Sequence, residues 1–170
     1  MYLRELKQED DRSYKDYITK WQQSKEHIVP SITNIDKYDS FASLVKYLKE
    51  TQISNHSWVP STTLFCFDEH TNRILGAINI RHHLNEQLQQ IGGHIGYGVS
   101  PGYRELGIAK FMVTVALEIL TEMNMTQVLI TCDDNNIASQ KVINHFNAKE
   151  IIPYLKQDGK KVRRYIIDLA

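Results

Sequence analysis

The sequence GGHIGYGVSPGYRELGIA, residues 92–109, decides our interpretation of the fold, because it joins a glycine-rich strand, a turn and the start of a helix. Glycine weakens a strand, so four glycines within residues 92–99 predict a bulge or the close approach of another chain or a ligand. Pro101 and Gly102 then turn the chain. The apolar periodicity that follows predicts a helix from about Leu106 to Met123.

The start of this helix offers a site for an anion. The first amides of a helix have no intrahelical partner, and the helix dipole adds partial positive charge there. Gly107 and Ala109 lack bulk, so an anionic group can approach the backbone closely. The segment has neither the Gly-Lys-Ser/Thr ending of a Walker loop nor the third glycine of a dinucleotide fingerprint. It therefore predicts a pyrophosphate cradle made of backbone groups.

The remaining elements extend outward from this segment in both directions. Strands are expected at residues 1–7, 62–67, 73–82, 91–99, 128–130, 151–155 and 162–169, and further helices around residues 14–21, 41–48 and 136–146. Residues 83–90 form a polar connection in this interpretation. With about seven strands, four helices and no linker, the sequence predicts one α/β domain with a mixed sheet over residues 1–170.

Composition and charge restrict the function classes. Apolar residues make up 42% and charged residues 24% of the chain, as in ordinary globular proteins, so disorder is not expected. The formal net charge is zero, whereas nucleic-acid binders usually carry a basic excess. The basic cluster at residues 160–164 is interpreted as a solvated hairpin. The N-terminal segment resembles no signal peptide and no stretch has the length of a membrane span, so we expect a cytoplasmic protein.

Cysteine and histidine residues do not predict a metal site. Cys66 and Cys132 lie far apart in apolar runs, which is typical of buried, reduced thiols. His82, His83 and His94 have poor spacing for zinc ligands. We therefore expect no metal.

Two motifs resemble those of the GNAT superfamily of acyl-CoA-dependent N-acetyltransferases. Residues 98–109 resemble its acetyl-CoA motif, Arg/Gln-x-x-Gly-x-Gly/Ala, and residues 134–139 resemble its second motif. The order of elements also matches, so the resemblance covers nearly the whole chain, and the strand at residues 92–97 is most similar to that of uncharacterised bacterial members. The resemblance implies a GNAT-like fold, acetyl-CoA as the acyl donor, and a primary amine of a small molecule or peptide as the acceptor.

The resemblance also implies which residues contact the donor. Backbone groups near Gly98 and Val99 would pair with the pantetheine amides as an added strand would. Asn136 would hydrogen-bond the pantetheine arm, with Ser139 one turn later on the same helix face. The backbone amides at residues 106–110 would hold the pyrophosphate. The implied donor-binding residues are Gly98, Val99, Arg104, Leu106, Gly107, Ile108, Ala109, Lys110, Asn136 and Ser139.

One departure from the family leaves the chemistry open. Many members carry a tyrosine seven residues after the motif asparagine, where it protonates the leaving thiolate; here that residue is Ile143. Either another group or solvent must supply the proton. The departure also keeps two non-enzymatic hypotheses open: a CoA-binding sensor or regulatory module without turnover, and a scaffold that uses the fold for protein contacts.

The candidate catalytic residues lie on the strand before the cradle, the candidate acceptor residues mostly end the preceding strand, and one lies in the irregular stretch at residues 53–61. His94 is a candidate general base, because its reference pKa of ~6.5 suits proton transfer near neutrality. Tyr97 is the second catalytic candidate, and the alternation of a flat strand would direct it to the opposite face. The candidate acceptor-binding residues are Trp58, Arg81, His82 and Asn85. We further expect a homodimer, because the C-terminal hairpin leaves a sheet edge to cover.

Overall fold

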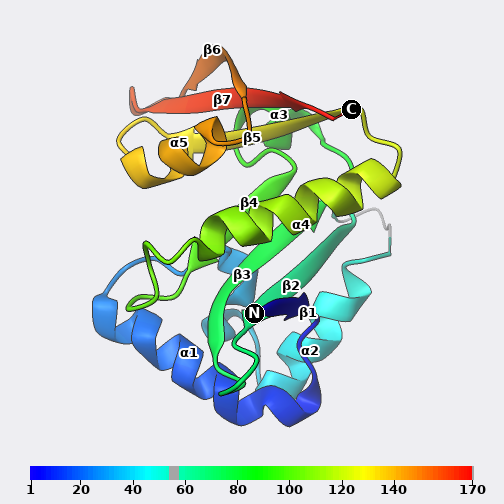
Figure 1. The fold of residues 1–170 in the computed structure, drawn as a ribbon, viewed down its shortest axis with the longest axis vertical. Coiled ribbons are helices and arrows are strands. Elements are labelled where there is room, and N and C mark those ends of the chain that lie inside the picture. The colour runs from blue at the N-terminus through cyan, green and yellow to red at the C-terminus, as the bar shows by residue number, and fades with distance from the viewer. Residues whose placement is uncertain (54–57, 170) are drawn as a thin grey trace.

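Figure 1 shows the computed structural model, which describes residues 1–53 and 58–169. In this part of the chain the strands are β1 (Tyr2–Arg4), β2 (Ser61–Phe67), β3 (Ile74–Arg81), β4 (Ile95–Val99), β5 (Gln127–Asp133), β6 (Lys149–Leu155) and β7 (Lys161–Asp168). The α-helices are α1 (Asp11–Ser24), α2 (Phe41–Glu50), α3 (Glu86–Gln90), α4 (Ile108–Glu122) and α5 (Ile137–Asn144). The α/β fold and its seven strands are confirmed.

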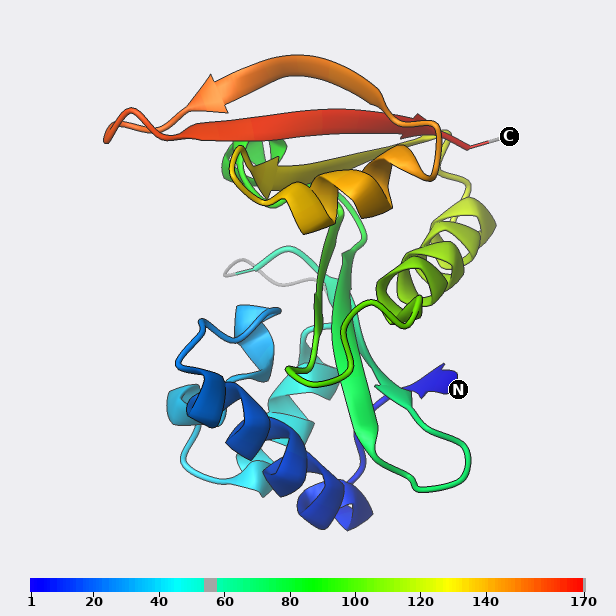
Figure 2. The same cartoon turned by 60° about the vertical axis from the view of Figure 1, so that its left-hand side comes forward.

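The strands divide into two sheets. One has the order β1-β2-β3-β4 and the other the order β5-β7-β6, and every neighbouring pair in the described residues is antiparallel. The sequence predicted one mixed sheet instead. The difference arises because, in the described residues, the two halves are bridged only at an isolated pair, between Gly93, just before β4, and Ile130 of β5. Figure 2 shows the consequence: the two sheets diverge from this point and leave an angle between them.

Helices cover the first sheet on both faces. Figure 2 shows α1 and α2 on one face and α4 on the other. The stripe predicted for α1 is buried, with Tyr14, Tyr17, Ile18 and Trp21 packed in one core against β2 and β3. A second core contains α4 and β5, in which Met112 and Val128 are 0% exposed. The strand at β5 is thus covered on both faces, as its apolar run predicted.

Three local differences from the sequence interpretation bear on the site. Residues 86–90 form α3, which begins where Asn85 accepts a hydrogen bond from the amide of Leu88 (2.9 Å). Gly92 and Gly93 have positive φ angles of 111° and 60°, so β4 begins only at Ile95. The helix α4 begins at Ile108 rather than Leu106.

The glycines of β4 serve close approach rather than a bulge. The register between β3 and β4 runs without a shift from Gly76–Val99 to Ile80–Ile95. A Cβ atom placed on Gly98 would lie 2.1 Å from the carbonyl oxygen of Val29. The segment after α1 therefore lies directly against this strand. None of the helices in the described residues is long and apolar enough to cross a membrane.

Candidate functional site

The two sheets join at a small hydrogen-bonded junction. The amide of His94 donates to the carbonyl oxygen of Leu129 (2.7 Å), and the amide of Gly92 donates to Oγ1 of Thr131 (2.8 Å). A Cβ atom on Gly93 would lie 2.3 Å from the carbonyl oxygen of Leu129, so the approach requires glycine there. This junction is the apex of the angle between the sheets.

The imidazole of His94 belongs to the junction. Its Nδ1 accepts a hydrogen bond from the amide of Leu129 (2.9 Å). In the neutral ring the other nitrogen, Nε2, then carries the proton, so neither nitrogen is a free acceptor for a proton from an amine. Burial lowers the pKa of His94 and favours this neutral form. The contact fits a structural role better than that of a general base.

Beyond the apex, the edge of β4 that faces the second sheet is open. In the described residues, Ile95–Val99 pair with β3 on one edge only. Tyr97 extends from β4 across the angle between the sheets, and its hydroxyl lies 2.9 Å from Oγ of Ser139 on α5. Burial raises the pKa of Tyr97 to about 12, so this hydroxyl stays protonated at neutral pH. A donor thus lies beside the open edge.

The loop from β4 to α4 ends in a backbone suited to an anion. Glu105 and Gly107 both have positive φ angles, 64° and 78°, and Gly107 is the N-cap of α4 without a side-chain cap. The first intrahelical bond runs from the amide of Phe111 to the carbonyl of Gly107 (3.0 Å), so the amides at residues 108–110 have no helical acceptor. In the part of the chain that the structure describes, a Cβ atom on Gly107 would have no neighbour within 4 Å. The first turn carries no acidic residue.

The side chain of Arg104 is turned away from this backbone. Its guanidinium pairs with both carboxylate oxygens of Glu26, at 2.6 and 3.1 Å, and lies 5.7 Å from the ring centre of Trp21. The hydrogen bond from Arg104 lowers the pKa of Glu26 below its usual range. Donors toward an anion at α4 are therefore main-chain amides in this structure, together with the side chain of Lys110.

The second motif lies on the other side of the angle. Oδ1 of Asn136 accepts from the amide of Ser139 (3.1 Å) and caps α5, which leaves its Nδ2 group as a donor. Ile143 is 0% exposed in the core. The position where many relatives carry a tyrosine is therefore filled by packing, and Tyr97 reaches the same helix from β4. Burial raises the pKa of the Cys132 thiol to about 11, and both cysteines are buried and free, as predicted.

The candidate acceptor residues do not form one cluster. Arg81 lies on the face of β4 that looks toward α1, with Nη2 3.5 Å from a Cβ atom placed on Gly96. His82 bonds Oγ1 of Thr62 through Nε2 (2.9 Å), and Asn85 is occupied as the N-cap of α3. Trp58 donates from Nε1 to the carbonyl of Ile53 (3.0 Å). Of these four residues in the described part of the chain, only Arg81 borders β4, through the carbonyl oxygens of Gly92 and Gly93 and beside Gly96.

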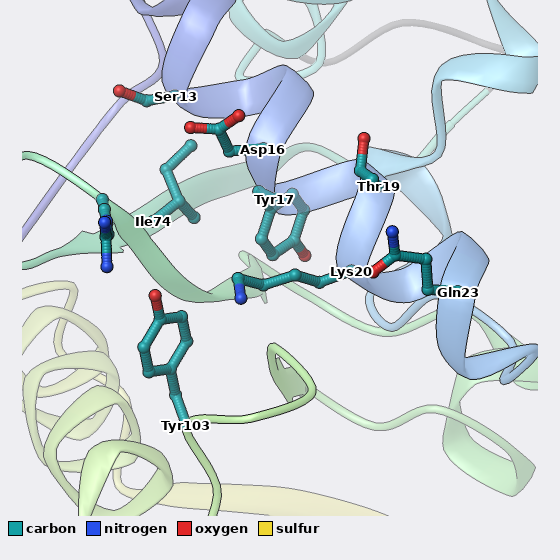
Figure 3. A pocket seen from close by; sticks show the side chains of 9 residues that line it. Ser13, Asp16, Tyr17, Thr19, Lys20, Gln23, Ile74 and Tyr103 are labelled. Carbon is teal, nitrogen blue, oxygen red and sulfur yellow. The ribbon is translucent and has the colours of Figure 1, made fainter.

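Two cavities lie outside the angle between the sheets. One, of about 310 Å³, lies between α1, the start of β3 and the loop before α4. Figure 3 shows its polar lining, in which Nζ of Lys20 lies 5.1 Å from the ring centre of Tyr103. The other, of about 570 Å³, borders His94, Leu129 and Arg164 at the apex. The histidine, cysteine, aspartate and glutamate side chains of residues 1–53 and 58–169 form no cluster that could hold a metal ion.

Sequence reasoning missed two neighbours of the site, Glu26 and Val29. Both belong to the segment between α1 and α2, which has no motif, and each meets its partner across a long separation, 78 residues for Glu26 and Arg104. The glycine content of β4 signalled that something approaches the strand, but not which segment. The spacing that placed Ser139 one turn after Asn136 is seen in α5.

Comparisons with known proteins agree with this geometry. A family model described as "Acetyltransferase (GNAT) domain" matches residues 1–149. A search of curated protein sequences found no significant match. Among solved structures, the ribosomal-protein-S5-alanine acetyltransferase of Vibrio fischeri is similar with a TM-score of 0.69 and 15% identity, covering 98% of this chain and 91% of that one.

Two further solved structures are similar over almost the whole chain. An acetyltransferase of Salmonella typhimurium, which modifies the N-terminal serine of ribosomal protein L7/L12, has a TM-score of 0.65 and 15% identity, with 99% and 94% coverage. A single-site variant of the spermidine N-acetyltransferase of Vibrio cholerae has a TM-score of 0.65 and 13% identity, with 99% and 95% coverage. At these identities the likeness shows the fold.

Proposed function

The chain belongs to the GNAT family of acyl-CoA-dependent N-acetyltransferases, and from this premise we propose that it transfers the acetyl group of acetyl-CoA directly to a primary amine. The observation that carries the proposal is the open angle between β4 and β5, with uncapped helix amides at one end and a protonated tyrosine beside it. GNAT enzymes use acetyl-CoA as acyl donor, and these groups fit the two polar parts of that molecule.

The donor would be held mainly by main-chain groups. The edge of β4 at Gly98 and Val99, which has no neighbouring strand in the described residues, can bond the pantetheine amides as an added strand would; they would replace the 3.5 Å bond from Nε of Arg104 to the carbonyl oxygen of Val99. The amides of residues 108–110, together with the positive end of the α4 dipole, suit the pyrophosphate. The Nδ2 group of Asn136 is available for the pantetheine arm. Leu106 and Gly107 precede the helix and would contribute amides from the loop.

Tyr97 would serve the leaving group. The amine nitrogen attacks the thioester carbonyl and forms the carbon–nitrogen bond, and the carbon–sulfur bond breaks so that negative charge develops on sulfur. The proton that the nitrogen loses goes to the thiolate or to water. A donor aimed at that charge stabilises the transition state. With a pKa raised to about 12, Tyr97 is a hydrogen-bond donor rather than a strong acid. We propose that it replaces the tyrosine that relatives carry at the position of Ile143.

Direct attack is favoured over an acyl-enzyme. Cys132 interacts with Ser139 and could act as a nucleophile, but the raised pKa of its buried thiol leaves little thiolate at neutral pH. His94 would hold the apex together, because its Nδ1 is occupied by the amide of Leu129. The amine then enters in its neutral form, and the acceptor's own pKa sets the fraction available.

The test is an amine panel with acetyl-CoA and spectroscopic detection of the released thiol. The panel contains amino acids, polyamines, aminoglycosides and peptides with free N-termini, and each reaction is compared with one that lacks the amine. Amine-dependent thiol release and an acetylated product by mass spectrometry support the proposal. Tight acetyl-CoA binding without turnover across the panel supports the sensor hypothesis, and absence of CoA binding supports the scaffold.

A further inference from the structure

Arg81, at the end of β3, has its guanidinium group on the sheet face that looks toward α1, and this group has no carboxylate partner in the described residues. Nη1 of Arg81 donates to the carbonyl oxygens of Gly92 (3.1 Å) and Gly93 (2.8 Å). Among the residues that the structure describes, Arg81 forms no salt bridge, and Nε and Nη2 make no hydrogen bond. Three of its five N–H groups therefore have no partner in this part of the chain.

A cation in this position favours an anionic partner. Arg81 is partly buried, and loss of water around the guanidinium lowers its pKa. Carbonyl oxygens satisfy donors but do not neutralise charge, so the cost of removing the cation from water is only partly offset. The Nε and Nη2 groups form one side of the planar fork, which matches the two oxygens of a carboxylate.

The free side of Arg81 borders an uncovered part of β4. Among the atoms of residues 1–53 and 58–169, a Cβ atom on Gly96 would find only Nη2 (3.5 Å) and Nη1 (3.8 Å) of Arg81 within 4 Å. Gly98, two residues along the same face, is covered by the carbonyl of Val29. The surface over Gly96 is thus bounded by Arg81 at one end and by the segment after α1 at the other.

This surface lies one residue from the proposed reaction site. Tyr97 follows Gly96 and extends from the opposite face toward Ser139. One strand residue spans about 3.3 Å, and the open edge of β4 separates the two faces, so a small acceptor that reaches around this edge can place its anionic group over Gly96 and its amine beside Tyr97. An acceptor whose amine and anionic group are close together would fit both.

We propose that Arg81 binds a carboxylate of the acceptor, and that the acceptor is an amine with a carboxylate a few bonds from its nitrogen. The inference rests on the proposed acetyl transfer and names its substrate class. Free amino acids and peptide N-termini followed by an acidic residue share this chemistry. Polyamines do not, and their charge is repelled by a guanidinium without a counterion.

The test compares acceptors that differ only in the carboxylate. Amino acids are paired with their amides, and dipeptides with an acidic second residue are paired with the corresponding glutamine or asparagine dipeptides. With wild-type protein we expect kcat/KM to be about 10- to 150-fold higher for the carboxylate, the range for hydrogen bonds to a charged group. In Arg81→Gln the ratio of kcat/KM for the acid to that for its amide should approach one, whatever the absolute activity of the variant. The kind of acceptor pair that shows this difference tells whether the acceptors are free amino acids or peptides.

Arg81→Lys keeps the positive charge but not the planar fork, so it should retain part of the preference for the carboxylate over the amide. It also shows whether loss of the contacts to Gly92 and Gly93 is enough to disable the protein. Acetyl-CoA affinity, measured by calorimetry, should be unchanged in both variants. Equal or better activity of the wild type with amides or polyamines overturns the inference but leaves acetyl transfer intact.

If no amine in the panel releases thiol, acetyl transfer fails and a binding experiment decides the role of Arg81. N-acetylglycine and its amide are then titrated into CoA-saturated protein and followed by NMR. Binding of the acid alone, lost in Arg81→Gln, supports carboxylate recognition. Failure of the acid to bind the wild type contradicts it.

Discussion

The substitution Tyr97→Phe tests the proposed catalytic geometry, because it removes one hydroxyl and leaves the ring that fills the space between β4 and α5. Among the described residues this hydroxyl bonds only Oγ of Ser139, at 2.9 Å. A neutral hydrogen bond contributes about 0.5–1.5 kcal/mol to stability. We therefore expect a small decrease in the free energy of unfolding and an almost unchanged affinity for acetyl-CoA.

The effect on turnover should be larger. A hydrogen bond to a charged group contributes about 1.5–3 kcal/mol, and tenfold in rate corresponds to about 1.36 kcal/mol. If Tyr97 donates to the developing thiolate, Tyr97→Phe should lower the single-turnover rate about 10- to 150-fold. The assay is rapid mixing of amine with protein saturated by acetyl-CoA, so that product release does not mask the chemical step.

Ser139→Ala is the matched control for this experiment. It removes the same hydrogen bond from the free protein but keeps the Tyr97 hydroxyl. We expect a similar loss of stability with a near-normal rate. A normal rate in Tyr97→Phe, or an equal rate loss in both variants, would refute the assignment of Tyr97 as donor to the leaving group.

Three further predictions concern His94, acid stability and assembly. Because Nδ1 of His94 is occupied, kcat/KM should rise with pH toward the acceptor's own pKa. His94→Ala should keep this pH profile and lose about 1–3 kcal/mol of stability. A limb of the pH profile near neutrality that is present in the wild type and absent in the variant would contradict this. Burial raises the pKa of Asp10, but the hydrogen bonds from Arg4, at 2.6 and 2.8 Å, lower it by more, so the pKa of Asp10 lies below its usual range. The stability that Asp10 adds is present above the unfolded pKa of ~3.9 and is lost as pH falls through the lower folded pKa. In chemical denaturation, Asp10→Asn should therefore cost about 3 kcal/mol at pH 7 and progressively less as the pH is lowered below ~3.9, and a cost that does not fall with pH would refute this. The outer strand β6 exposes Ile152 (82%) and Leu155 (65%), so we predict a homodimer through this edge. Sedimentation that detects only monomer at high protein concentration would exclude this dimer.

Much of the fold followed from local patterns in the sequence. The offsets of Tyr14, Tyr17 and Trp21 predicted the buried face of α1, since helical periodicity depends on neighbours only. The register between β3 and β4 is regular from Ile95 to Val99, and the side chains of His94 and Tyr97 have different partners, Leu129 and Ser139. The division into two sheets was not predictable, because it depends on where β4 and β5 stop pairing.

The candidate site was predictable where it depends on backbone and not where it depends on distant side chains. Positive φ at Gly107 and the uncapped start of α4 follow from local sequence. The bond from Tyr97 to Ser139 joins residues 42 apart. The orientation of Arg104 toward Glu26 is likewise set by packing across the fold. No local signal in a single sequence encodes such pairs, so the roles of the side chains required the structure.

The most direct test of the central claim, that the angle between β4 and β5 with the start of α4 is the acetyl-CoA site, is a calorimetric titration of Gly107→Asp and Gly107→Asn with acetyl-CoA. Both variants place a side chain of similar size at the same positive φ, where a Cβ atom has no neighbour within 4 Å, so both should fold. Only aspartate adds charge. Charges about 4 Å apart interact by roughly 1–4 kcal/mol between aqueous and surface-like dielectrics, and a pyrophosphate carries more than one. We predict that Gly107→Asp binds acetyl-CoA about 30- to 900-fold more weakly than Gly107→Asn, for a repulsion of about 2–4 kcal/mol. Equal affinities in the two variants would contradict the assignment of the pyrophosphate to the start of α4.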